Sequence, residues 1–201
     1  MRLRSVAPFV FIFCLVAVAQ ACAGISVEID LQEQRAYLLQ NGRAVVSSPI
    51  SSGRYGHLTP AGDFTIIDKD MNHLSSIYGK IVDSRGETIN ADADVDMPRP
   101  PGAKFVPAPM HYFMRFHGGD GMHSGYLPGY AASHGCVRMP KDRAALFYAN
   151  VEVGTPVHVF GRTPPRGMRT PQFVEDIKER TRAIPDFFRR QFQPGWRPGG
   201  R

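Results

Sequence analysis

The stretch HSGYLPGYAASHGCVRM, residues 123–139, brings one cysteine close to two histidines. Cys136 follows His134 by two residues and His123 by thirteen. A cysteine nucleophile needs a thiolate, a base that takes its proton, and N–H donors for the oxyanion. A free thiol has a pKa of about 8.5, and a neighbouring imidazolium lowers it by several units. The stretch holds a candidate for each requirement.

Either histidine satisfies the spacing required of the base. His123 ends a predicted strand that is separate from the cysteine segment, so it can face the thiol across a site. In an extended segment, His134 would point to the same face as Cys136. Gly135 permits a tight turn, in which the N–H groups of Gly135 and Cys136 converge on a carbonyl oxygen.

Two other interpretations of the thiol stay open on residue types alone. Free cysteines often serve as small buried apolar residues, which would make Cys136 structural. His123, His134 and Cys136 would also suit an open zinc site, although the chain has no paired spacing such as C-x-x-C or H-E-x-x-H. Nucleophile, buried thiol and metal ligand are therefore the three alternatives.

The N-terminus has the pattern of a secretory signal, which we expect to cover residues 1–23. Arg2 and Arg4 form the basic start, FVFIFCLVAVA is the apolar run, and AQACAG is the small-residue cleavage region. Cleavage is expected after Ala21 or Ala23. The apolar run is short for a membrane span, so an uncleaved anchor is the alternative. The protein is therefore expected in the periplasm or cell envelope.

The cysteine count bears on the role of the thiol. Cys14 and Cys22 lie in the signal, so cleavage after Ala23 leaves Cys136 alone. A lipoprotein signal at Cys22 is weakly supported, because Gln20 stands among its upstream residues. Exported proteins usually oxidise cysteines in pairs, and a leftover thiol is a candidate reactive group.

Charge divides the chain into a domain at 24–161 and a basic tail at 162–201. Residues 161–201 carry ten Lys/Arg and four Asp/Glu, which equals the net charge of +6 of the whole chain. Such a tail suits anionic envelope polymers or lipid headgroups. Nucleic acid is not an expected partner, since the chain has an export signal and no recognition motif. One helical face of the tail is apolar and suits docking on the domain or, as the alternative, on a membrane; it comprises Phe173, Ile177, Ile184 and Phe188.

The remaining pattern predicts a mostly β domain, a curved sheet or sandwich with one or two short helices. Apolar alternation predicts strands in ISVEIDL, GDFTIID, MHYFMRFHG, DGMHSG and GTPVHVF, and a hairpin around Asn41-Gly42. The helix is expected in PKDRAALFYAN, with Pro140 in its first turn and Asn150 at its end. Lys69 to Pro109 is expected to be a long mid-domain loop, a lid or substrate rim. Its DADVD motif resembles a calcium loop but lacks the required glycine and glutamate, so a solvated loop is expected.

The Ser-His-Gly-Cys core with its upstream histidine resembles the signature of the L,D-transpeptidase catalytic domain. In this chain the core spans residues 133–136 and the histidine is His123, while Arg138 follows. The segments VEIDLQEQRAYLLQNGRAV, SSGRYGHLTPAGDFTI, MHYFMRF and GTPVHVF are similar to further parts of that family. The resemblance covers roughly residues 25–160 and excludes the tail.

The resemblance implies that Cys136 is the nucleophile and His123 its base, with Ser124 beside the base. Ser133, His134 and Gly135 would form the cysteine loop and the oxyanion hole with the Cys136 backbone.

Two further positions follow from the same resemblance. Arg138 would hold the loop or meet a substrate carboxylate, and Tyr112 would line the substrate channel.

The implied reaction concerns peptidoglycan biosynthesis, cell wall organisation and cell shape. The thiolate would attack a stem tetrapeptide at the bond to its terminal D-alanine, and an amine of a neighbouring stem would resolve the thioester into a 3–3 crosslink. No metal or organic cofactor is expected, because thiolate, imidazole and backbone donors suffice. Alternatives are resolution by water (carboxypeptidase or endopeptidase), resolution by a protein lysine (wall anchoring), and a non-catalytic wall-binding module.

Overall fold

A three-stranded meander opens the domain, as the apolar alternation predicts. It comprises β1 (Ile25–Asp30), β2 (Arg35–Gln40) and β3 (Arg43–Pro49). In β1, Val27 and Ile29 are buried while their neighbours are half-buried. Asn41 and Gly42 both have positive φ, 54° and 74°, as the two central residues of a type I′ hairpin turn require. The predicted hairpin is confirmed. The computed structural model describes residues 24–165, and the expected signal (1–23) and most of the tail (166–201) lie outside them.

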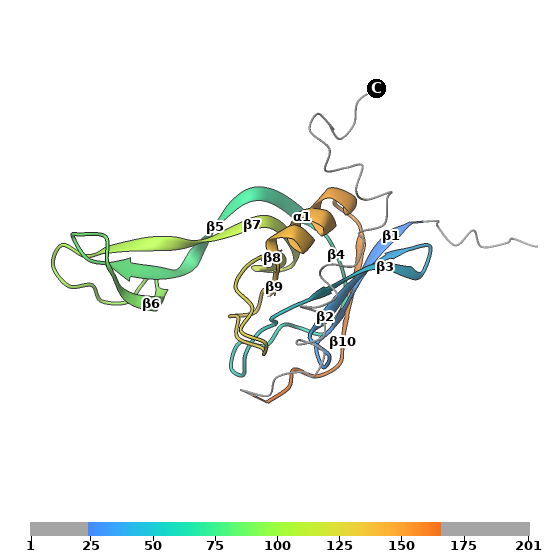
Figure 1. The fold of residues 1–201 in the computed structure, drawn as a ribbon, viewed down its shortest axis with the longest axis horizontal. Coiled ribbons are helices and arrows are strands. Elements are labelled where there is room, and N and C mark those ends of the chain that lie inside the picture. Colours follow the sequence, from blue (N-terminus) through green and yellow to red (C-terminus); the bar gives the residue numbers. More distant parts are fainter. Residues whose placement is uncertain (1–23, 166–201) are drawn as a thin grey trace, which may run out of the picture.

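Two mixed sheets form the domain (Figure 1). The first has the order β3-β2-β1-β10-β4 and is completed by β4 (Gly62–Thr65) and β10 (Pro156–Phe160). The second has the order β6-β5-β7-β8-β9, with β5 (Asp68–Val82), β6 (Thr88–Asp94), β7 (Lys104–His117), β8 (Asp120–Ser124) and β9 (Val137–Met139). The pairs β1–β10 and β8–β9 are parallel, and the other paired strands are antiparallel. The mostly β prediction is confirmed.

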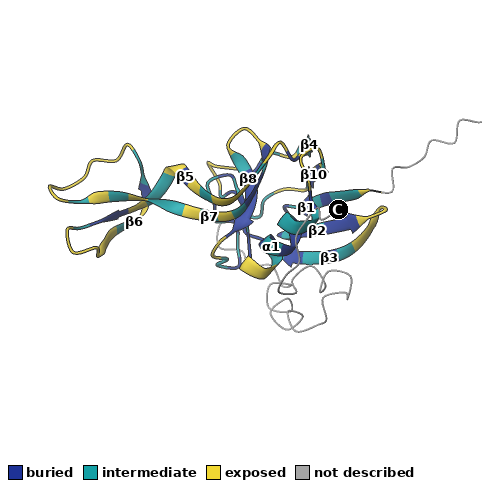
Figure 2. Cartoon of the chain, turned by 90° about the horizontal axis from the view of Figure 1, so that it is seen from above, coloured by how far each residue is buried: buried dark blue, intermediate teal, exposed yellow. Residues whose placement is uncertain are grey.

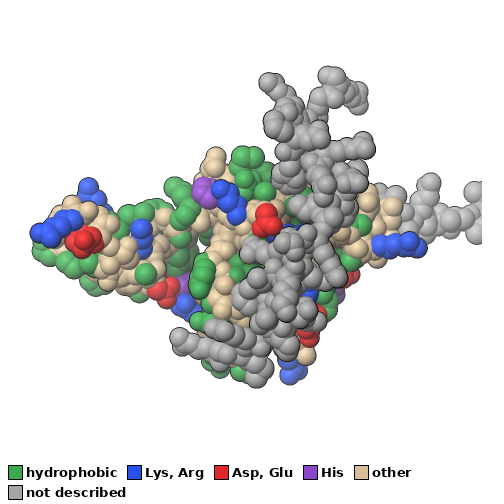
Figure 3. All heavy atoms as spheres, in the orientation of Figure 1, with side chains coloured by type: hydrophobic (Ala, Val, Ile, Leu, Met, Phe, Trp, Pro, Cys, Tyr) green, Lys and Arg blue, Asp and Glu red, His purple; other side chains and the backbone are tan. Residues whose placement is uncertain are grey.

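The region expected to be a long loop is a three-stranded arm. Residues 74–109, here called the arm, run through the far parts of β5 and β7 with β6 beside them, and project from the body (Figure 1). The prediction was wrong because both faces of the arm are largely exposed, so no apolar alternation marks its strands (Figure 2). Hydrophobic side chains lie among charged ones on its surface (Figure 3), and Leu74, Ile77 and Ile89 are each about half exposed.

The hydrophobic core lies between the two sheets and under the single helix of residues 24–165, α1 (Lys141–Asn150). Val27 and Val157 from the first sheet, Met122 and Val137 from the second, and Phe147 of α1 belong to one cluster. One face of the β8–β9 pair therefore packs against this cluster, and the opposite face of the pair lines a cavity.

The helix begins one residue later than predicted and ends where expected. Pro140 precedes α1 and its carbonyl accepts the Ala144 N–H at 2.8 Å, so Pro140 is the N-cap and does not occupy the first turn. Asn150 is the last helical residue and its side-chain amide donates to the Leu146 carbonyl at 2.8 Å. No helix within residues 24–165 is long and apolar enough to cross a membrane.

Candidate active site

The parallel pairing of β8 with β9 brings the predicted nucleophile and base to one face. His123 is paired with Arg138, while Met122 and Val137 are paired one position earlier and are buried in the core. Side chains alternate between the two faces of a strand, so Cys136, two residues before Arg138, lies on the face of His123. All three residues line one cavity of about 410 Å³.

The cavity lies between the body and the base of the arm. Ile77, Tyr78 and Pro109 contribute apolar surface from β5 and β7, and Tyr126 lies in the loop after β8. Apolar surface beside several convergent polar side chains is typical of a site for an organic substrate. Residues of the arm thus line one side of this cavity, and they lie in strands and not in the expected loop.

Cys136 is a free, half-buried thiol. Its Sγ–H donates to the Gly119 carbonyl at 3.8 Å. Burial raises the pKa of the Cys136 thiol to about 11; a Gly121 N–H hydrogen bond opposes this and the Asp120 charge adds to it. The thiol is therefore protonated in the resting protein, whereas a neighbouring imidazolium would have lowered its pKa.

His123 is 6% exposed and has one tautomer that fits its surroundings. Its Nδ1 lies 2.8 Å from the Ser124 carbonyl oxygen, which can only accept, so Nδ1 carries the hydrogen and Nε2 has the free lone pair. Burial lowers the pKa of His123 to about 4, so the ring is neutral at neutral pH. A neutral imidazole with a free Nε2 can accept a proton from a neutral thiol during attack. Ser124 orients it through its backbone carbonyl.

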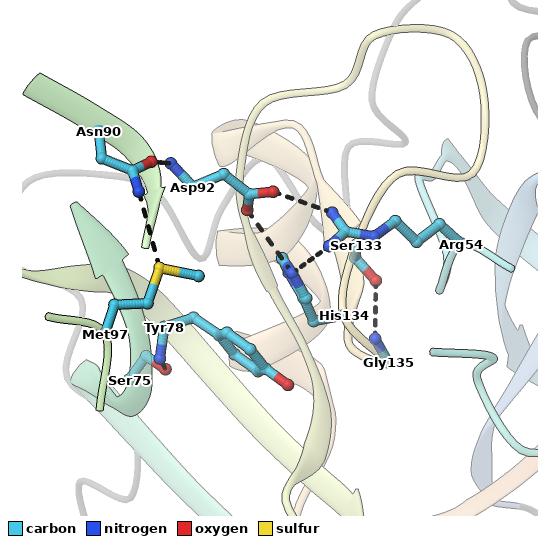
Figure 4. Close-up of polar contacts among 9 residues, drawn as sticks. All are labelled: Arg54, Ser75, Tyr78, Asn90, Asp92, Met97, Ser133, His134 and Gly135. Atoms are coloured by element: carbon cyan, nitrogen blue, oxygen red, sulfur yellow. Dashed lines mark hydrogen bonds and ion pairs between the residues drawn. The ribbon is translucent and has the colours of Figure 1, made fainter. Parts of the chain in front are cut away.

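The Nε2 lone pair of His134, unlike that of His123, has a hydrogen-bond donor (Figure 4). Arg54 Nη2 donates to His134 Nε2 at 2.6 Å, and a guanidinium cannot accept a hydrogen bond. The lone pair of His134 Nε2 is therefore occupied. Burial, and next the Arg54 charge, lower the pKa of His134. The two histidines, which spacing alone could not separate, differ here in whether a ring nitrogen is free to take a proton.

Asp92 and Tyr78, both of the arm, lie on the other side of His134 (Figure 4). Asp92 Oδ2 is 3.3 Å from Arg54 Nη1, and Asp92 Oδ1 is 3.5 Å from His134 Nε2. The Tyr78 ring stacks on His134 with centroids 4.1 Å apart. Asp92, expected in a solvated loop, thus links the arm to the segment that carries Cys136.

In the cysteine loop, residues 125–136, the last four residues are fixed by internal hydrogen bonds. The Ser133 hydroxyl donates to the Cys136 carbonyl and accepts the Gly135 N–H at 3.2 Å. The Gly135 N–H was expected to face a substrate oxygen, yet it is used within the loop. The Cys136 N–H is then the loop donor nearest the thiol. Gly135 has φ of 121°, and a Cβ there would lie 2.2 Å from Asp120 Oδ1, so the loop requires glycine.

Hydrogen bonds from the segment 51–59 support the cysteine loop. Thr59 Oγ1 accepts the Gly53 N–H at 2.9 Å and donates to the Gly135 carbonyl at 2.6 Å. The Arg54 N–H donates to the Ser133 carbonyl at 3.0 Å. These contacts join the Thr-Pro-x-Gly segment to the Ser-His-Gly-Cys core across 76 residues or more.

Arg138 lies where it can contact both the cysteine loop and the cavity. Its backbone exchanges two hydrogen bonds with Ser51, at 2.9 and 3.0 Å, which fastens the end of the cysteine loop. Its side chain lines the cavity, and the aliphatic part packs under Gly125, where an added Cβ would lie 3.0 Å from Cγ. A guanidinium in this place can bind a carboxylate through two parallel hydrogen bonds.

Tyr112 does not lie where the sequence placed it. It packs against the core beside Tyr148 of α1, with ring centroids 5.9 Å apart, and does not line the cavity. Its φ of 59° departs from the extended form, so the simple alternation used to orient it does not apply. Tyr78 and Tyr126 line the cavity instead.

Sequence reasoning also missed Arg54, Asp92, Asp120 and the hydroxyl of Thr59. Arg54 has no spacing that marks it, since its partners Asp92 and His134 are 38 and 80 residues away. Zinc has no support within residues 24–165, where no group of three His, Cys, Asp or Glu side chains could hold a metal ion.

Comparison with known proteins points to one family. Residues 24–159 match the sequence model of the YkuD family, described as the L,D-transpeptidase catalytic domain. A comparison with curated proteins gives no match.

Several solved structures are similar to this fold. An L,D-transpeptidase from Stackebrandtia nassauensis has a TM-score of 0.53 and 22% identity over 72% of this chain and 58% of that one. An L,D-transpeptidase from Mycobacterium smegmatis has a TM-score of 0.51 and 26% identity over 69% and 59%. A mutant L,D-transpeptidase from Enterococcus faecium has a TM-score of 0.50 and 25% identity over 68% and 50%. The match thus spans less than two thirds of those chains.

Proposed function

The chain belongs to the L,D-transpeptidase catalytic domain family, and we propose that it is a cysteine L,D-transpeptidase that acts on peptidoglycan stem peptides. One observation carries the proposal. Cys136 and His123 line one cavity, and hydrogen bonding leaves the Nε2 lone pair of His123 free while that of His134 is occupied by Arg54.

In the proposed first half-reaction, Cys136 Sγ attacks the carbonyl between the third stem residue and the terminal D-alanine. The thiol proton passes to His123 Nε2 as the S–C bond forms, because burial keeps both groups neutral at rest. The tetrahedral oxyanion is stabilised by N–H donors of the cysteine loop, with Cys136 N–H the nearest. His123 then donates the proton to the leaving amine, and D-alanine departs.

In the proposed second half-reaction, the amine of a neighbouring stem attacks the thioester. The N–C bond forms, the S–C bond breaks, and a proton returns through His123 to Sγ. The product is a 3–3 crosslink. Arg138 is suited to bind a carboxylate of the donor stem, since its side chain lines the cavity that Cys136 lines. No step requires a metal or an organic cofactor.

The test is incubation of the purified mature protein with disaccharide-tetrapeptide, followed by mass spectrometry of protein and products. The wild type is expected to release D-alanine, gain the mass of the acyl group, and form a crosslinked dimer. Cys136→Ala and Cys136→Ser are expected to do none of these, because neither side chain supplies a thiolate. Turnover by either variant would overturn the assignment of the nucleophile.

The same products separate the alternative acceptors. A free tripeptide stem would indicate hydrolysis, and transfer to a lysine-containing protein would indicate wall anchoring. A protein that binds sacculi but never acquires an acyl group would be a wall-binding module.

We further propose that the protein acts in the periplasm or cell envelope, because its substrate lies there and the N-terminal pattern is that of an export signal. Fractionation of cells that express the tagged full chain tests this. Recovery of the protein in the cytosol alone, at full length, would contradict it.

A further inference from the structure

A carboxylate lies directly beside the thiol, and the mechanism above does not use it. Asp120 is the first residue of β8 and lines the cavity. Its two chain neighbours both contact the sulfur: Gly119 through its carbonyl, at 3.8 Å, and Gly121 through its N–H. Oδ1 of Asp120 also lies close against Gly135 of the cysteine loop. The carboxylate is therefore held next to the position of the acyl-thioester.

Asp120 differs in charge from the rest of the cavity wall. It is the single acidic side chain among the described residues that line the cavity, while Arg115, Arg138 and three histidines also line it. Its side chain is about a quarter exposed (25%). The one ion-pair partner that the structure gives it, His117 Nδ1, is 3.7 Å from Oδ2, beyond hydrogen-bond distance. A half-buried carboxylate with so little compensation is suited to receive a cation.

The first half-reaction gains nothing from this charge. A negative carboxylate next to the sulfur opposes the thiolate, and the Asp120 charge raises the pKa of Cys136. Any benefit of Asp120 that offsets this higher thiol pKa must therefore come in the second half-reaction, when the thioester is resolved. An acceptor amine is an ammonium ion at neutral pH, with an ordinary pKa of about 10.4, so it arrives as a cation and must lose a proton before it can attack.

We propose that Asp120 forms the binding site for the acyl-acceptor amine, holding a primary ammonium group beside the Cys136 thioester. This inference rests on the proposed function and assigns its acceptor. The carboxylate attracts the ammonium and takes one proton from it, which it releases to solvent when the crosslinked product leaves. The neutral amine nitrogen then forms the N–C bond while the S–C bond breaks, and its second proton passes through His123 to Sγ. The donor stem and the acceptor amine are thus bound by groups of opposite charge, Arg138 and Asp120.

The experiment compares the two half-reactions in the mature wild-type protein and in Asp120→Asn. Released D-alanine reports acylation, and hence the proposed function. The ratio of crosslinked dimer to hydrolysed tripeptide, measured over a range of acceptor concentrations, reports the acceptor site. In the first turnover, before the thioester is resolved, Asp120→Asn is expected to release D-alanine at least as fast as the wild type. Its ratio of dimer to tripeptide is expected to fall by about tenfold or more, as for one lost charge-assisted hydrogen bond.

Two controls separate ammonium binding from a general role in structure. Asp94→Asn removes a carboxylate of the arm outside the cavity lining and is expected to leave the ratio unchanged. Hydroxylamine, uncharged at mildly alkaline pH, is expected to resolve the thioester of Asp120→Asn as fast as that of the wild type. Asp120→Ser, which adds no bulk against Gly135, is expected to behave like Asp120→Asn. An unchanged ratio in both variants, or an equal loss with hydroxylamine, would overturn the inference.

Discussion

Replacing Thr59 by valine tests how the segment 51–59 supports the cysteine loop. Thr59 is 3% exposed, and its hydroxyl accepts the Gly53 N–H and donates to the Gly135 carbonyl. Valine has nearly the same shape but leaves both backbone groups buried without a partner. Each such group costs about 1–3 kcal/mol, so Thr59→Val is expected to lower the free energy of unfolding by about 2–6 kcal/mol.

Thr59→Ser is the matched control, because it keeps the hydroxyl and removes only a methyl group. The loss of one buried methyl costs about 1 kcal/mol. Urea titrations of the two variants, compared by their midpoints at equal slope, give the difference directly. The hydroxyl is not the supporting contact if Thr59→Val is as stable as Thr59→Ser.

The same pair of variants also tests the link to the thiol. The Gly135 carbonyl lies one residue before Cys136, so freeing it should loosen the loop that carries the nucleophile. In conditions where both variants are fully folded, Thr59→Val should release D-alanine more slowly than Thr59→Ser. Equal rates would mean that the contact stabilises the fold without positioning Cys136.

Three further predictions follow from the site and the tail. His123→Ala is expected to slow D-alanine release by about 10²–10⁴-fold, and His134→Ala by less, because its lone pair is taken by Arg54; the reverse order would make His134 the base. The pKa of His123 is about 4 in the folded protein against an ordinary 6.5, so the unfolded chain takes up the proton first and stability falls as pH drops through this window. In urea titrations, the free energy of unfolding of the wild type should fall by about 3 kcal/mol across this pH window, and that of His123→Gln should not; the same pH dependence in both proteins would contradict the prediction. Truncation after Arg162 should preserve D-alanine release and weaken binding to sacculi or anionic vesicles mainly at low salt, since salt screens exposed charges over about 10 Å at 0.1 M; lost activity or a lower melting temperature would instead favour docking of the tail on the domain.

The site was predictable where the chemistry depends on residue type and short spacing. Cys136 was singled out because a lone thiol near two histidines is unusual in an exported chain, and the resemblance to the L,D-transpeptidase signature then favoured His123 over His134 as its base. Arg138 was identified only through the resemblance to the L,D-transpeptidase signature. Gly135 was expected to allow a turn, and its positive φ agrees.

Other parts of the site could not be found this way because their partners are distant in sequence. Arg54 contacts His134 across 80 residues and Asp92 across 38. A single Arg or Asp has no pattern until the strands are paired. The arm was predicted to be a loop for a related reason. Its strands are largely exposed on both faces, so hydrophobic periodicity does not mark them, and only their cross-strand pairing identifies them.

The β-rich domain, its first hairpin, its helix and the candidate thiol could all be predicted from the amino-acid order. These features depend on local alternation, turn residues and residue type, which a linear chain displays. Which histidine has a free lone pair could not be predicted before the chain had folded. That depends on the Ser124 carbonyl at His123 Nδ1 and on the Arg54 guanidinium at His134 Nε2. The tertiary structure also decides the protonation of the resting pair, because burial, which raises the pKa of Cys136 and lowers that of His123, exists only once the sheets have packed.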